Sequence, residues 1–353
     1  MVFFVFLTSS CFLVDDGDSQ KFVSEDSGYD NFFPEKLVIL KAFKSETPIE
    51  KIKIFYSISG SKIINYGYPV FTSSSQVTTE YTINTLGNDF LPAGVVINYY
   101  YEITDIENNV TVSESNELEY LDDHFEWERV TGRGLEIVHH ALLKNQSFNL
   151  HDKVTKRIAP IKEIFLQDPN SFNIKGVLFD SRQESSKAFQ YLSDTTTKKH
   201  LFGGFAYPDY GLFLVNGYNP DVIVHEITHL ILGEAMGIRR TLLPKWLNEG
   251  LAMYYQNNGD SWRKESKNFV QKTQIMTLNK MNSLPGKVSD VGLFYRKSEN
   301  VVGYLISEYG VEKIGVLIEY LKIQGDFKSN FYRTYGISID ELEKNWRESI
   351  LFE

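Results

Sequence analysis

The sequence predicts an α+β protein, in which an antiparallel β-sandwich of residues 30–118 precedes an α+β domain of residues 119–353. Three observations predict this order. Apolar residues recur with period two from residue 33 to about residue 115, short strands mix with amphipathic helices after residue 120, and almost everything after residue 220 is helical. A chain of 353 residues is long enough for two domains, and 42% hydrophobic with 23% charged residues is the composition of a folded protein.

Three alternating segments, rich in β-branched and aromatic residues, predict half-buried strands in the first domain; they lie at residues 52–58, 77–83 and 95–103. Turn residues at 105–109 predict a hairpin after the last of them. Several short strands over so few residues are typical of a sandwich of the immunoglobulin or fibronectin type.

The second domain is expected to alternate strands and helices before it becomes helical. Strands are predicted at residues 125–128, 135–138, 175–179 and 212–215, and helices at 150–166, 181–192, 219–236, 244–255, 300–321 and 337–350. Breaks are expected near Gly237, Pro244, Gly259, Pro285 and Gly310.

Charge and cysteine content exclude several classes of protein. The chain has 36 basic and 46 acidic residues, a formal charge of −10, and no strong basic block, so nucleic acid is not an expected partner. The single cysteine, Cys11, excludes an intrachain disulfide framework, a cysteine-ligated zinc finger and an iron–sulfur cluster. Any metal must therefore be held by histidine and carboxylate.

Residues 1–14 form a signal-like segment. Its apolar run is shorter than the roughly 20 residues that a membrane-spanning helix needs, and it ends at acidic residues, although the usual basic region before it is missing. We expect export to an extracytoplasmic location, either secreted or at the cell surface. Association with the cell envelope through a lipid on Cys11 is a second reading, and a hydrophobic tail on a cytosolic protein is a third. The sequence does not set the oligomeric state.

The segment at positions 225–229 reads His-Glu-Ile-Thr-His within an apolar run. On an α-helix, His225 and His229 lie about 40° apart around the axis and about 6 Å apart along it, so both imidazoles can reach one Zn²⁺. Glu226 lies beside this face, about 60° around the axis from His229. A carboxylate there can contact a water on the metal without becoming a ligand.

A third ligand is expected from the second helix. Glu249 follows His229 by 20 positions, enough chain for one helix to end and another to return. Two histidines and one glutamate leave a fourth tetrahedral position for water, as in catalytic zinc sites. Zinc would lower the pKa of that water towards about 7 and polarise a substrate carbonyl. Glu226 would take the water's proton and pass it to the departing amine. A pair of buried histidines without a metal is the alternative.

These residues resemble the gluzincin metallopeptidases, the thermolysin-like group with His-Glu-x-x-His and a distal glutamate. More closely, the chain is similar to bacterial peptidase MA-like proteins with an immunoglobulin-like β-sandwich domain in front of the catalytic one. The matching stretches lie at residues 120–127, 203–207, 225–229, 246–252 and 304–310.

The resemblance implies a thermolysin-like zincin fold, with an α+β sheet and a helical subdomain. It implies one Zn²⁺ per chain, with His225, His229 and Glu249 as ligands and Glu226 as the catalytic base. One position departs from the pattern. Thermolysin-like enzymes carry an aspartate four residues after the ligand glutamate, where this chain has Met253. The acceptor that orients a ligand histidine is then expected to be a backbone carbonyl or another acid.

The resemblance also suggests substrate contacts. Gly203, Gly204, Phe205 and Ala206 precede the strand at 212–215, and in gluzincins a strand placed there pairs with the substrate backbone. An ordinary glycine-rich turn before a core strand is the alternative.

A tetrahedral intermediate also needs a group that stabilises its negative charge. Tyr295 and Tyr304 lie on the helix where related folds place that group, although a packing role is an alternative for each.

The sequence thus predicts an exported zinc-dependent peptidase that acts on a peptide or protein substrate. A catalytically inactive zincin-fold protein that binds at the cell surface is the alternative, and an enzyme that cleaves a non-peptide bond with the same zinc geometry is a narrower one.

Overall fold

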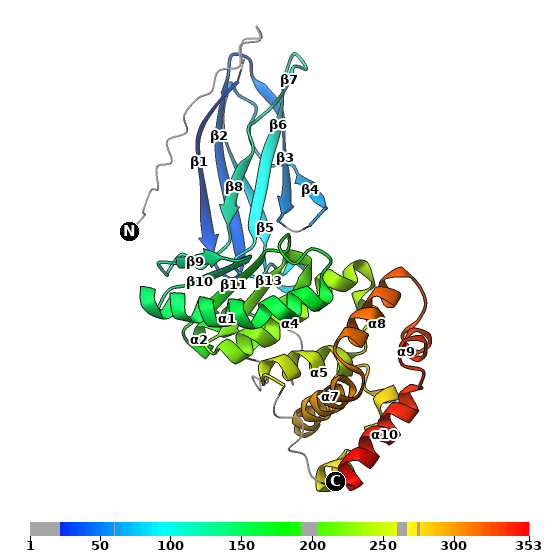
Figure 1. The fold of residues 1–353 in the computed structure, drawn as a ribbon. Coiled ribbons are helices and arrows are strands. Elements are labelled where there is room, and N and C mark those ends of the chain that lie inside the picture. The colour runs from blue at the N-terminus through cyan, green and yellow to red at the C-terminus, as the bar shows by residue number, and fades with distance from the viewer. Residues whose placement is uncertain (1–21, 60, 192–202, 260–266, 274–275, 353) are drawn as a thin grey trace.

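The computed structural model describes residues 22–59, 61–191, 203–259, 267–273 and 276–352. The signal-like segment 1–14, with Cys11, lies outside these residues, as does the end of the helix predicted at 181–192. Two antiparallel sheets come first in the chain, a mixed sheet with helices follows, and further helices complete the C-terminal end (Figure 1). The α+β class and its order are confirmed. Within the described residues, no helix is long and apolar enough to cross a lipid bilayer.

The first two sheets contain antiparallel pairs. One has the order β1-β2-β5; the other has the order β4-β3-β6-β7, with β8 also paired to β6. Their bounds are β1 Phe22–Phe32, β2 Lys36–Ser45, β3 Ile49–Ile58, β4 Ile64–Gly67, β5 Gln76–Asn84, β6 Val96–Asp105, β7 Val110–Val112 and β8 Asn116–Glu119. Every second residue of β6 is buried, as its alternation predicts.

The predicted hairpin lies between β6 and β7. The Asp105 carboxylate accepts the backbone N–H groups of Glu107 and Asn109 at 2.9 and 2.8 Å, which fixes the turn. Residues of both sheets share one buried cluster, in which the rings of Phe43 and Tyr101 meet edge to face with centroids 5.1 Å apart. The immunoglobulin or fibronectin type and the domain boundaries stay predictions.

The mixed sheet has the order β12-β13-β11-β10-β9, with a parallel centre and an antiparallel strand at each edge. Its strands are β9 Glu128–Gly132, β10 Leu135–His139, β11 Ile174–Phe179, β12 Gly204–Tyr207 and β13 Leu212–Asn216.

The strand predicted at 125–128 is wrong, because β9 begins only at Glu128. Phe125 and Trp127 instead pack their rings on His140, at 4.2 and 5.1 Å between centroids.

The helices are α1 Lys144–Phe165, α2 Arg182–Ala188, α4 Pro220–Met236, α5 Lys245–Gln256, α6 Lys267–Lys272, α7 Val288–Tyr309, α8 Glu312–Ile323, α9 Phe327–Tyr335 and α10 Ile339–Phe352. Short 3₁₀ turns lie at η1 Gly87–Asp89, η2 Pro208–Tyr210, η3 Gly237–Leu242 and η5 Leu278–Lys280.

Most of the predicted helix bounds shift by one or two residues, and four change by more. The single helix predicted at 300–321 is wrong, because α7 ends at Tyr309 and α8 begins at Glu312, with the expected break at Gly310 between them. Helix α1 begins six residues before the predicted 150, because the Gln146 side chain accepts the Leu143 backbone N–H at 3.0 Å and caps an earlier turn. Helix α2 ends at Ala188, before the predicted 192. Helix α7 begins at Val288, twelve residues before the predicted 300.

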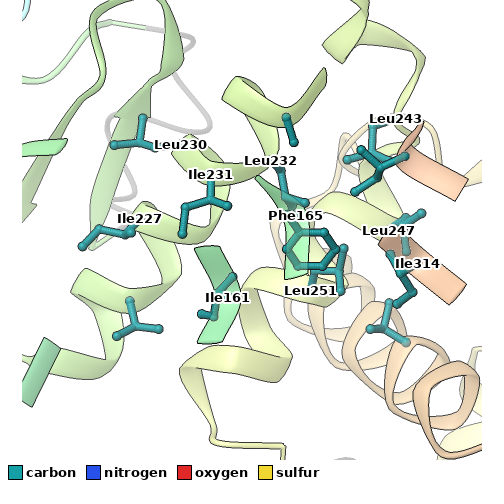
Figure 2. Packing of buried hydrophobic residues seen from close by; sticks show 14 of the residues in the cluster. Ile161, Phe165, Ile227, Leu230, Ile231, Leu232, Leu243, Leu247, Leu251 and Ile314 are labelled. Carbon is teal, nitrogen blue, oxygen red and sulfur yellow. The ribbon is translucent and has the colours of Figure 1, made fainter. Parts of the chain in front are cut away.

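One hydrophobic cluster joins the helices that carry the candidate site to the mixed sheet. Figure 2 shows Ile227, Leu230 and Ile231 of α4 together with Phe165 of α1 and Leu251 of α5, all of them buried. Because α4 is apolar over most of its surface, it can be buried between α1, α5 and the sheet (Figure 1). This packing fixes the rotation of α4 and so the direction of its polar residues.

Candidate metal centre

The helix that carries the His-Glu-x-x-His segment begins and ends where the sequence predicts. The Asn219 side chain accepts the backbone N–H of Asp221 at 2.9 Å, and Pro220 occupies the first turn. Gly237 ends the helix with a φ of 53°, in the left-handed region that favours glycine.

Helix α5, which carries Glu249, packs closely against its neighbours. The backbone N–H of Trp246 donates to the Met281 carbonyl at 3.1 Å, and the Trp246 ring is buried. At Gly250, an added Cβ would lie 2.4 Å from the Ser298 carbonyl oxygen of α7, so only glycine allows this approach of the two helices. Glu249 is the residue before this contact, and its side chain is only 4% exposed.

Three side chains from α4 and α5 converge on one point. The Glu249 Oε2 atom lies 3.4 Å from His225 Nε2 and 3.3 Å from His229 Nε2, and the two ring nitrogens are 3.2 Å apart. This oxygen is buried, and no described residue donates a hydrogen bond to it. Two imidazole nitrogens and one carboxylate oxygen that converge on one point are a donor set that suits zinc.

The orientation of His229 is set by a neighbouring side chain. His229 Nδ1 lies 2.9 Å from the Asn248 side-chain oxygen, which can only accept, so the ring donates from Nδ1 and directs Nε2 at Glu249. The expectation of a backbone carbonyl or an acid is therefore wrong for this histidine. Met253 occupies the aspartate position, and a side-chain amide from the residue before Glu249 provides the acceptor instead.

Glu249 also binds a cation through its other oxygen. Lys245, one turn earlier on α5, places its Nζ 2.7 Å from Glu249 Oε1. Burial alone would raise the pKa of Glu249, but the two histidines and Lys245 outweigh it and hold that pKa well below its usual range. The carboxylate is therefore ionised and available as a ligand.

Glu226 lies beside the three converging groups and is 6% exposed. Burial raises its pKa to about 7, and the Glu249 carboxylate adds to the rise while His225 opposes it. Strand β12 passes directly over it, since a Cβ on Gly204 would lie 2.8 Å from Glu226 Cγ. A carboxyl group with a pKa near neutrality can both accept and return a proton.

A cavity of about 260 Å³ opens over these groups. Gly204, Phe205 and Ala206 of β12 line it, and β12 is the outermost strand of the mixed sheet as described. Gly203 does not line it; its carbonyl accepts the Asn216 N–H at 2.8 Å and holds β12 to β13.

The two candidate tyrosines of α7 lie in different environments. Tyr295 lines the cavity, with its ring centroid 6.4 Å from that of His225. Burial and the carboxylates of Glu249 and Glu226 raise the pKa of Tyr295, so its hydroxyl stays protonated and can donate.

Tyr304 does not line the cavity, so the structure contradicts its predicted place in the site. Nine residues after Tyr295 it lies about 180° around the helix and about 13 Å along it, and it is buried in the core.

Sequence reasoning missed Lys245 and Asn248. The i,i+4 spacing from Lys245 to Glu249 is readable in the sequence, and it predicts a helical ion pair. Asn248 adjoins the predicted ligand, but its contact depends on a side-chain orientation that spacing does not give.

The C-terminal part of the chain matches a known family of proteins. Residues 185–352 match the sequence model of the Peptidase MA superfamily. This stretch contains His225, His229 and Glu249. No curated protein sequence matches the chain.

Three solved structures overlap with it. Yeast LTA4 hydrolase in complex with bestatin is 10% identical, with 93% of this chain and 68% of that one covered and a TM-score of 0.41. Legionella pneumophila aminopeptidase A in complex with aspartic acid is 13% identical, with 94% and 50% covered and a TM-score of 0.42. BhCBM56 is 11% identical, with 26% and 88% covered and a TM-score of 0.20. This chain spans half the length of the Legionella protein.

Proposed function

We propose that the protein is a zinc-dependent peptidase of the gluzincin type. The observation that carries the proposal is the convergence of His225 Nε2, His229 Nε2 and Glu249 Oε2 beside the buried Glu226, within one cavity. The Peptidase MA match over residues 185–352 supports it.

Each side chain would have a separate task. His225, His229 and Glu249 would hold the zinc, which when bound activates water and polarises a carbonyl. Glu226 accepts a proton from the attacking water and returns it to the leaving nitrogen. Tyr295 donates its hydroxyl hydrogen to the oxygen on which negative charge develops.

The edge strand suggests how a peptide is held. An extended peptide can pair with the outer edge of β12, which would place its backbone across the cavity above Glu226. Peptides and proteins are therefore the proposed substrates. We also propose export, in line with the apolar segment 1–14.

Substitution of Glu226 by Gln tests the proposal. Gln has the same shape but cannot accept the proton, so we expect hydrolysis of a peptide mixture to fall about 10²- to 10⁴-fold while zinc stays near one per chain. Glu234→Gln, on the same helix, is the matched control. Unchanged hydrolysis by the Glu226 variant would end the peptidase proposal. Zinc binding without any hydrolysis by the unaltered protein would favour the inactive binding protein instead.

A further inference from the structure

Lys245 is a cation in direct contact with the central carboxylate of the site. Its Nζ lies 2.7 Å from Glu249 Oε1, its side chain is 37% exposed, and it lines the cavity. Glu249 Oε1 therefore faces the lysine, whereas Oε2 faces the two histidines.

The stability of α5 does not explain a lysine at this place. Lys245 is the first residue of the helix, and the first turn contains no acid. The N-terminus of a helix is the positive end of its dipole, which disfavours a cation there. A lysine placed before a glutamate is also the less favourable order for an i,i+4 pair. The position therefore costs helix stability, and the contact with Glu249 is what it provides.

We propose that Lys245 is a positioning residue which restricts Glu249 to binding a metal through one oxygen. This inference rests on the proposed zinc site. A free carboxylate can turn and offer both oxygens to a cation. With Oε1 engaged by Lys245, only Oε2 remains, and a third protein ligand with a single atom keeps the four-coordinate arrangement of a catalytic site.

A positioning role for Lys245 and a purely electrostatic effect of its charge predict opposite changes in zinc affinity when Lys245 is removed. A positive charge so close to a divalent metal repels it, so electrostatics alone predicts that removal of Lys245 tightens zinc binding. If Lys245 orients the ligand, its removal weakens binding, as the loss of groups that orient metal ligands typically does, by about 10- to 100-fold.

The experiment compares Lys245→Met, Lys245→Arg and Arg240→Met in the full chain. Arg240 is a second cation of the cavity, but its guanidinium binds Asp209 at 2.7 and 2.8 Å, so this variant removes charge without releasing Glu249. Zinc affinity is measured by competition with a chelator, and the coordination number by the visible absorption of the cobalt(II)-substituted protein. We expect about 10- to 100-fold weaker zinc binding and a weaker, five-coordinate cobalt spectrum for Lys245→Met only. Lys245→Arg, which keeps the donor, should restore both properties.

Unchanged or tighter zinc binding by Lys245→Met would overturn the positioning role of Lys245. Weaker zinc binding with an unaltered cobalt spectrum would also overturn it. These results differ from failure of the proposed function, which appears as an unaltered protein that binds no zinc. Circular dichroism of each variant separates a folding defect from a loss of metal.

Discussion

Replacement of Asn248 by Leu tests how strongly the metal site depends on the orientation of His229. In the structure the Nδ1–H of His229 donates to the Asn248 side-chain oxygen at 2.9 Å, and the histidine side chain is only 14% exposed. Leucine has a similar size but accepts no hydrogen bond. A histidine that binds metal through Nε2 must carry its proton on Nδ1, so the variant leaves this N–H buried and unsatisfied whenever metal is bound.

The expected loss of zinc affinity follows from this buried, unsatisfied N–H. A buried donor without an acceptor costs about 1–3 kcal/mol. Without metal, the ring can move its proton to Nε2 and avoid the cost, so nearly all of it falls on the metal-bound state. At about 1.4 kcal/mol for each factor of ten, zinc affinity should fall about 5- to 140-fold.

Chelator competition measures the affinity, with two comparison variants. Asn248→Asp keeps an acceptor and should bind zinc at least as tightly as the unaltered protein. Asn257, at the C-terminal end of α5, donates from its side-chain amide to Glu299 of α7 at 2.8 Å. Asn257→Leu removes this amide and should leave zinc affinity unchanged. An affinity of Asn248→Leu within twofold of the unaltered protein would refute the reasoning, because the hydrogen bond would then contribute nothing to the bound state.

Three further predictions follow from other parts of the structure. Gly204→Ala places a Cβ 2.8 Å from Glu226 Cγ, so β12 must move. The value of kcat/KM for peptides should then fall about 10²-fold while the zinc content stays unchanged. Gly292→Ala, where the space around the Cβ is open, should leave kcat/KM unchanged. Tyr295→Phe removes the proposed hydroxyl donor and should lower kcat about 10²- to 10³-fold with little change in KM, which steady-state kinetics would show. Lys297 is fully buried, and burial lowers its pKa from 10.5 to about 8. The unfolded chain therefore binds more protons between these values, and the free energy of unfolding should rise by about 2 kcal/mol from pH 7.5 to pH 9.5. Urea unfolding of the protein and of Lys297→Met would measure this, since the variant should lack that part of the rise.

The sequence predicts best those elements whose signal is local. Helix α4 has an apolar run between Asn219 and Gly237, which supply its start and its end, and the structure keeps both. Three strands of the first two sheets, β3, β5 and β6, follow from period-two alternation, because one face is buried and the other is not.

Other elements depend on contacts between distant residues. Phe125 and Trp127 have the composition of a strand, but their rings pack on His140, which sequence spacing does not reveal. The candidate site also combines features that local sequence predicts with features that depend on packing between distant residues. The spacing from His225 to Glu249 predicts convergence, whereas separating Tyr295 from Tyr304 requires the rotation of α7, which is set by packing along its whole length.

The close approach at Gly250 has a consequence for how the site responds to a substrate. Backbone lies against backbone between α5 and α7, so neither helix can slide without a collision with the other. The backbones that carry Glu249 and Tyr295 are therefore coupled, and a shift of α7 at Tyr295 would also shift the carboxylate. If the proposed function holds, substrates of different bulk would be accommodated at the opposite wall, where β12 is the outermost described strand of its sheet.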